Sequence, residues 1–192
     1  RNGRSTKSFM EEGRLDAIDR EIGEGDFLFI QFGHNDEKKE DLSRYTEPFS
    51  TYIENLETYI RAARRHGANP VLITPIERRH FDENGNLMAS MHTEYAAGMK
   101  MAAEKNNVPL VDLLTMSRAV LEQAGEQESR KWHMFFDAGI YENYPEGKQD
   151  NTHLRYEGAQ LYAGLIAKGL LALGGIYAEL IVEGAQNYYA KV

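Results

Sequence analysis

The sequence contains no cysteine among its 192 residues. A disulfide framework, a thiolate zinc site and a cysteine nucleophile are therefore excluded. Any covalent catalysis must use another residue type. Because cysteine usage is what would report the redox compartment, the sequence does not separate a secreted or periplasmic protein from a cytoplasmic one.

The sequence also lacks long apolar runs and a positive charge excess. No apolar stretch approaches the roughly 18 residues needed to cross a bilayer, so we expect a soluble protein without a membrane partner. The formal net charge of −8 argues against nucleic acid as a partner, because phosphate binding needs clustered Lys and Arg. The first residues, Arg1–Ser5, are polar and do not form a secretory signal. Nothing in the sequence indicates an oligomeric state.

What is present is the pattern of a folded α/β protein. With 42% hydrophobic and 27% charged residues, the chain is expected to form a single domain over residues 1–192. Short, nearly all-apolar strands are expected at residues 27–32, 71–74 and 108–113. Helices are expected at 9–22, from Thr46 to before Gly67, and at 93–105, 115–124 and about 155–173. This alternation predicts a parallel sheet covered on both faces, a three-layer α/β/α sandwich.

The sequence contains two polar clusters. One follows the first predicted strand, and the other precedes the last predicted helix. Ligands of open α/β sheets lie beyond the carboxyl ends of the strands, where Gly33-His34-Asn35-Asp36 is expected. The Asn35 amide could donate to a developing negative charge, although a polar turn with a local hydrogen bond explains the same residues.

The second cluster is Asp150-Asn151-Thr152-His153, just ahead of the last helix. A carboxylate three residues before a histidine can hold the imidazole through Nδ1–H and leave Nε2 free as a base. The alternative is a helix N-terminus, where Asp, Asn and Thr are favoured caps and the histidine is incidental.

Taken together and in this order, the clusters resemble conserved blocks of the SGNH (GDSL-like) hydrolases. Gly33–Asp36 is similar to the third block, and Asp150 with His153 to the fifth. The residues of the second block resemble those of the rhamnogalacturonan acetylesterases. The residues on both sides of Gly33 are also typical of that branch of the family. The residues that carry this likeness are Asn2–Ser5, Ser8-Phe9, Gly13–Asp16 and Ile30–Glu37.

The resemblance implies a flavodoxin-like sheet and a carbohydrate esterase that needs no cofactor or metal. His153 would be general base and then general acid, and Asp150 its orienting partner. The backbone N–H of Gly3 and the side chain of Asn35 would form two arms of an oxyanion hole. The substrate implied is an acetylated pectin-type polysaccharide or its oligomers, deacetylated through an acyl-enzyme.

The chain departs from the family at the first block, Gly-Asp-Ser, which is absent because Gly25-Asp26 is followed by Phe27. Ser5 and Ser8 lie near the second block, but no strand-to-helix elbow is expected there. The nucleophile is therefore unknown within these residues. We expect it upstream of Arg1, together with the first strand, so that the domain is incomplete at its N-terminus.

Other residues are weaker candidates for contact with substrate. They are His34, Arg78, His80, Trp132 and His133. The competing interpretation of His34 is a turn histidine. Arg78, Arg79 and His80 would instead be a solvated charge run after the second strand. For the aromatic residues near Trp132, the alternative is core packing. His66 and His92 are expected at the surface.

Three other functions stay open. One is an SGNH esterase or lipase for a different acyl ester, and another is a non-catalytic carbohydrate-binding domain with the same fold. A metal protein could use His34, Asp36, His80 and His153, but no compact His-x₃-His spacing is present, so no metal is expected.

Overall fold

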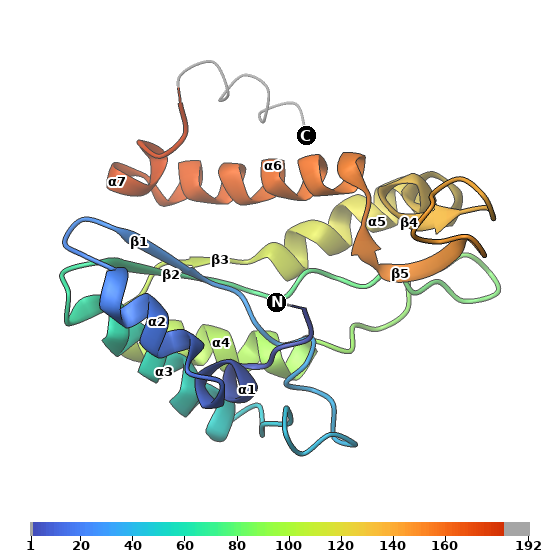
Figure 1. Cartoon of the computed structure of the whole chain (residues 1–192). Coiled ribbons are helices and arrows are strands. Elements are labelled where there is room, and N and C mark those ends of the chain that lie inside the picture. Colours follow the sequence, from blue (N-terminus) through green and yellow to red (C-terminus); the bar gives the residue numbers. More distant parts are fainter. Residues whose placement is uncertain (1, 183–192) are drawn as a thin grey trace. The chain divides into compact units, whose positions relative to one another are not determined.

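The computed structural model describes residues 2–182, and these fall into two compact units that alternate along the chain (Figure 1). Among the described residues, the sheet unit consists of residues 2–75 and Met91–Leu114, and the hairpin unit of Ile76–Ser90 and residues 115–182. The single domain expected over residues 1–192 stays a prediction.

The sheet unit contains a parallel three-stranded sheet. Strands β1 (Phe27–Ile30), β2 (Asn69–Ile73) and β3 (Leu110–Val111) lie in the order β1-β2-β3. The connections contain helices α3 (Thr51–Arg64) and α4 (Thr93–Asn106), and α1 (Thr6–Glu11) and α2 (Arg14–Glu21) precede β1. The α/β class with a parallel sheet is therefore confirmed, whereas the third layer stays a prediction.

The core of the sheet unit follows from the apolar stripe of α3. Leu56 and Ile60, one helical turn apart, are buried and pack in one cluster with Leu72 of β2 and Met99 of α4. Each such side chain contributes about 1.5–3 kcal/mol on burial. Helix α4 passes close to the start of α3 because it carries Gly98, where a side-chain carbon would lie 2.2 Å from a backbone oxygen.

Two expected helices have different boundaries. The helix expected at 9–22 is two helices, because Gly13 adopts a left-handed backbone with φ of 68° between them. The helix expected to start at Thr46 starts at Thr51 instead. The reason is tertiary: the buried Thr46 side chain donates to the carboxylate of Asp36 and does not cap a helix.

The hairpin unit is built around an antiparallel pair of strands. Helix α5 (Leu113–Ser129), which begins in the sheet unit, is followed by the short 3₁₀ helix η1 (Arg130–Trp132). Strands β4 (His133–Phe136) and β5 (Lys148–Leu154) follow, and then α6 (Tyr156–Leu173) and α7 (Gly175–Ala178). Within residues 125–149, where the sequence carries no regular helical or alternating pattern, β4 pairs with the start of β5. Among the described residues, no helix has the length and apolarity needed to cross a membrane.

Candidate active site

Asp150 and His153 lie at an irregularity in strand β5. The pairing with β4 shifts from Met134 opposite Asp150 to His133 opposite Leu154. Residues 151–153 are therefore extra on β5 and have no partner residue on β4. Bulges of this kind bend a strand and redirect its side chains, and they are common beside active sites. The two residues belong to a strand, and α6 begins only at Tyr156.

The Asp150–His153 pair has the geometry of an oriented base. His153 Nδ1 lies 2.8 Å from Asp150 Oδ2, and Asp150 Oδ1 accepts the backbone N–H groups of Thr152 at 2.8 Å and His153 at 3.0 Å. Partial burial opposes ionisation of Asp150, but these hydrogen bonds outweigh it and lower the pKa of the carboxyl to about 2. The ionised carboxylate fixes the proton on Nδ1, so Nε2 of His153, whose side chain is 65% exposed, is left as the base.

Two arginines hold the extra residues of β5 in place. The backbone N–H of Arg79 donates to Asn151 O and its guanidinium Nη1 to Asn151 Oδ1, both at 2.9 Å. The guanidinium is buried, donates to Ser129 Oγ at 3.1 Å and lies 4.9 Å from the ring centre of Phe135. Arg78 donates from Nη1 to Thr152 Oγ1 at 2.7 Å. The charge run after β2 is thus partly a support for the Asp150–His153 pair.

The prediction that the charged residues after β2 are exposed to solvent is wrong for Arg79, because its side chain is buried. Sequence reasoning missed its role because an arginine in a polar run carries no local sign of burial. Arg78, a candidate for substrate contact, touches the extra residues of β5 directly.

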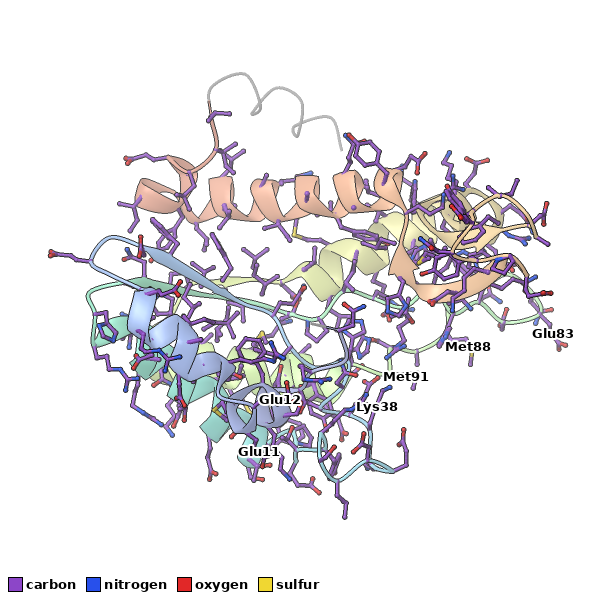
Figure 2. All side chains as sticks on the ribbon, in the orientation of Figure 1. Glu11, Glu12, Lys38, Glu83, Met88 and Met91 are labelled. Carbon is purple, nitrogen blue, oxygen red and sulfur yellow. The ribbon has the colours of Figure 1, made fainter. Side chains whose placement is uncertain are left out.

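The remaining candidates in the hairpin unit have structural contacts. The carbonyl of half-buried His80 accepts the backbone N–H of Met88, across the turn that carries Glu83 (Figure 2). The carbonyl of Trp132 accepts the N–H of Arg155 at 2.9 Å.

The side chain of His133 is fully buried and packs against neighbouring residues. Its Nδ1 lies 3.2 Å from Ser129 O, and its ring meets Tyr162 edge-on at 6.3 Å. Burial also lowers the pKa of His133, so the neutral imidazole is favoured.

In the sheet unit, a buried carboxylate joins the two segments that contain Gly3 and Asn35. Asp36 accepts the backbone N–H of Thr6 at 3.0 Å and the hydroxyl of Thr46 at 3.1 Å, and the Thr6 hydroxyl also donates to it. Burial raises the pKa of Asp36 to about 6 despite these bonds. Asp36 therefore fixes the start of α1 against the loop that follows β1.

As a result, Gly3 and Asn35 lie around one guanidinium. Arg44 Nη1 donates to Asn35 Oδ1 at 3.4 Å, and a side-chain carbon at residue 3 would lie 3.5 Å from the same nitrogen. The Asn35 amide NH₂ faces the Arg4 carbonyl at 3.4 Å, which is long for a hydrogen bond and easily exchanged for a stronger acceptor. Arg4 is in turn paired with Glu12, at the end of α1 (Figure 2).

Beside this loop, His34 belongs to a small ionisable cluster. Its ring centre lies 4.2 Å from that of His92, and His92 Nδ1 lies 2.7 Å from Glu37 Oε2. The expected surface position of His92 is wrong, because its side chain is fully buried. Within residues 2–182, no three His, Asp or Glu side chains gather as a metal site would require.

The hydroxyl groups of Ser5 and Ser8 form hydrogen bonds that cap the start of α1. Ser5 is the N-cap: its hydroxyl accepts from Ser8 N at 3.1 Å, and Ser8 Oγ accepts from Ser5 N at 2.9 Å. This reciprocal capping box satisfies helix N–H groups. In neither case does the serine sit on a turn from a strand into a helix.

An aspartate hydrogen-bonded to a histidine is an arrangement that serine hydrolases use to orient their base. Residues 1–161 match the model of the GDSL-like Lipase/Acylhydrolase family, and the chain belongs to that family. The chain is thus an esterase.

Similar proteins agree with this assignment. The chain is 43% identical over 174 residues to rhamnogalacturonan acetylesterase RhgT of Bacillus subtilis (strain 168), covering 91% of this chain and 73% of the relative. It is 42% identical over 181 residues to probable rhamnogalacturonan acetylesterase YesY of the same organism, covering 94% and 78%. The solved structure of the YxiM protein of Bacillus subtilis has a TM-score of 0.73 at 24% identity over 91% of this chain and 44% of that chain, which shows a shared fold.

Proposed function

We propose that the protein removes acetyl groups from rhamnogalacturonan, the pectin-type polysaccharide, or from its oligomers. The observation that carries the proposal is the Asp150–His153 pair, with Nδ1 and Oδ2 at 2.8 Å on a strand irregularity. The names of the relatives at 42% and 43% identity support the acetyl group and the polysaccharide.

In this mechanism, His153 Nε2 takes the proton from a serine hydroxyl as the serine attacks the acetyl carbonyl. Asp150 stabilises the imidazolium that forms. The backbone N–H of Gly3 and the Asn35 amide donate to the oxyanion of the tetrahedral intermediate, and one such donor typically contributes about 10²–10³ in kcat. His153 then returns the proton to the sugar oxygen as it leaves, and the acyl-enzyme is hydrolysed by water.

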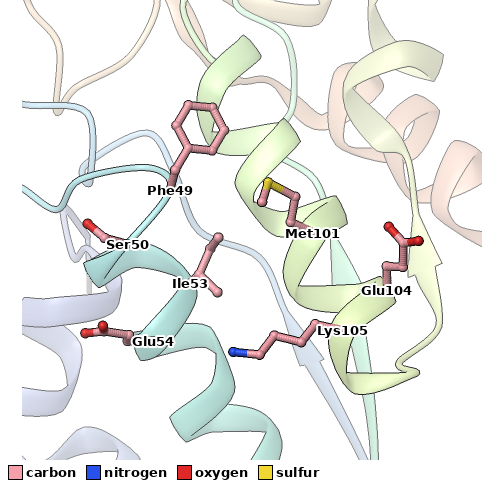
Figure 3. A pocket seen from close by; sticks show the side chains of 7 residues that line it. All are labelled: Phe49, Ser50, Ile53, Glu54, Met101, Glu104 and Lys105. Carbon is pink, nitrogen blue, oxygen red and sulfur yellow. The ribbon is translucent and has the colours of Figure 1, made fainter.

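The proposed nucleophile is a serine outside these 192 residues. Six of the seven serine hydroxyls make hydrogen bonds within the structure, namely those of Ser5, Ser8, Ser43, Ser90, Ser117 and Ser129. The seventh, Ser50, lines an open pocket between α3 and α4 (Figure 3). The seven residues that line this pocket include Glu54 and Lys105 but no histidine, so no imidazole base is among its walls.

The test uses the full-length protein and a fluorophosphonate, which reacts with activated serines. We expect labelling of one serine, mapped by peptide mass spectrometry to a peptide absent from the present sequence, and loss of labelling in His153→Ala. Labelling of Ser50 or of any other serine in these residues would contradict this proposal for the nucleophile.

Substrate choice is measured separately, as acetate released from acetylated rhamnogalacturonan and as hydrolysis of p-nitrophenyl acetate, butyrate and decanoate. We expect acetyl to be preferred and all turnover to depend on His153. Preference for a longer acyl chain would replace the acetylesterase with another esterase of the family. Sugar binding without turnover would instead indicate a carbohydrate-binding protein.

A further inference from the structure

An open pocket in the hairpin unit lies directly after the Asp150–His153 pair. We call it the aromatic pocket, and its volume is about 250 Å³. Its lining residues come from β4, from the loop between β4 and β5, and from the end of β5 through Arg155 to the first turn of α6: Met134, Phe136, Tyr141, Tyr144, Leu154, Arg155, Tyr156 and Glu157. Leu154 follows His153 in the chain, so the pocket begins one residue from the base.

The tyrosine side chains that line the aromatic pocket are more exposed to solvent than is usual for aromatic residues. Tyr156 is 73% exposed and Tyr141 is 44% exposed. Core packing therefore does not account for them, and a gathering of exposed aromatic groups marks a binding surface.

The pocket is also ordered. Phe136 contacts Tyr141 and Tyr144 edge-on, with ring centres 4.6 and 5.5 Å apart. The two tyrosines are joined by a tight turn in which Tyr144 N donates to Tyr141 O at 3.0 Å. The Tyr156 hydroxyl accepts from Gln160 on the next turn of α6 at 3.1 Å. A preformed aromatic wall loses little conformational entropy when a ligand binds.

A charged pair completes the rim. Arg155 Nε lies 3.9 Å from Glu157 Oε2, and both side chains are partly exposed. At that distance the ion pair is loose, so the guanidinium has N–H donors available to a second carboxylate. Arginine is well suited to this because its fork of donors matches the two oxygens of a carboxylate.

From these features we propose that the aromatic pocket is a subsite for one uronic acid ring of the polysaccharide. The C–H face of a pyranose ring covers the apolar face of a tyrosine, its hydroxyls reach the polar rim, and its carboxylate pairs with Arg155. A volume of about 250 Å³ lies just below the range typical of drug-sized ligands, which suits one ring and not several. The inference rests on the proposed function, because it names how that substrate is held.

The test compares two variants on two substrates. Tyr156→Ala is expected to lower kcat/KM for acetylated galacturonate-containing oligomers about 10-fold, mainly through KM, since one aromatic contact is removed. On p-nitrophenyl acetate, which has no sugar ring, the loss is expected to be about 2-fold at most. The matched control is Phe49→Ala, an exposed aromatic of the pocket in Figure 3, which should change neither rate.

Arg155→Gln tests the carboxylate. We expect KM to rise about 10-fold for the uronate oligomer, the effect of losing one charge-assisted hydrogen bond, and to stay the same for the carboxyl-reduced oligomer. An equal rise on both would leave a ring subsite without uronate specificity and overturn this part of the proposal. An equal loss on p-nitrophenyl acetate in either variant would show that the pocket only supports the fold.

A direct binding measurement separates this inference from the proposed function. Deacetylated galacturonate-containing oligomers are titrated by calorimetry into the His153→Ala protein and into the same protein with Tyr156→Ala. Binding that is lost with Tyr156 supports the subsite even if acetyl release fails. Binding that does not depend on Tyr156, or no binding, refutes the subsite even if the esterase is active.

Discussion

Replacing Asp150 by asparagine changes one atom type at the centre of the hydrogen bonds around His153. In the wild type, Oδ1 accepts two backbone N–H groups and Oδ2 faces His153 Nδ1. The asparagine oxygen can keep the two backbone bonds, but its NH₂ then faces Nδ1. Nδ1 must become the acceptor, so the proton moves to Nε2. The base is lost because the imidazole is in the wrong tautomer.

The size of the effect follows from two quantities. For catalysis, the same change in a Ser-His-Asp triad lowers kcat about 10⁴-fold, so we expect a loss of about 10³–10⁴-fold here. For stability, the pKa of Asp150 falls from 3.8 to about 2 on folding. That difference corresponds to roughly 2 kcal/mol.

The sign of the stability change depends on pH. Because the folded-state pKa is depressed, the stabilisation is fully present above pH 3.8 and is lost as the pH falls through about 2. Asp150→Asn should therefore unfold about 2 kcal/mol more easily at pH 7, and the difference from wild type should close toward pH 2.

The assay is hydrolysis of p-nitrophenyl acetate by the full-length protein, with urea unfolding followed by circular dichroism between pH 2 and 7. The matched control is Asp137→Asn, which removes an exposed carboxylate from the loop between β4 and β5. Less than a 10-fold loss of kcat in Asp150→Asn, while His153→Ala abolishes turnover, would refute the orienting role. Unfolding equal to that of Asp137→Asn at pH 7 would refute the stability reasoning.

Three further predictions test the supports of the site and the core. Arg79→Met keeps an unbranched apolar stem but removes the guanidinium donors to Asn151 and Ser129; we expect kcat to fall about 10-fold and the unfolding free energy by about 2–3 kcal/mol, measured by kinetics and urea unfolding. Asp36 has a raised folded-state pKa of about 6, so its contribution is present below pH 3.8 and lost as the pH rises through 6; the stability of wild type relative to Asp36→Asn should drop by roughly 2–3 kcal/mol between pH 4 and 8 in urea titrations. Gly98→Ala places a carbon 2.2 Å from the carbonyl oxygen of Pro48, and thermal unfolding should report a loss of about 2–3 kcal/mol, whereas no loss would mean that α4 moves away freely.

Interactions between residues a few positions apart could be predicted from the sequence. The apolar stripe of α3 predicts its buried face, because residues one helical turn apart share a side of the helix. The spacing of Asp150 and His153 likewise brings their side chains within reach of each other, whatever surrounds them. Both inferences need only a short window of sequence.

The residues that surround the Asp150–His153 pair could not be predicted from the sequence. The extra residues at 151–153 exist only because β5 pairs with β4 in a shifted register, and the interval between those strands carries no alternating pattern that would announce a hairpin. The same limit applies to Arg79, whose polar neighbours predicted solvent exposure. Its burial depends on Ser129 and Asn151, which lie far along the chain.

The sequence by itself determined the α/β class, the identity of the family blocks and the Asp150–His153 contact. Only the tertiary structure decided that Gly3 and Asn35 meet around one guanidinium, because their approach depends on Asp36 binding Thr6, thirty residues earlier. Burial and hydrogen bonding between distant residues are properties of the folded chain as a whole, so no short window of sequence contains them.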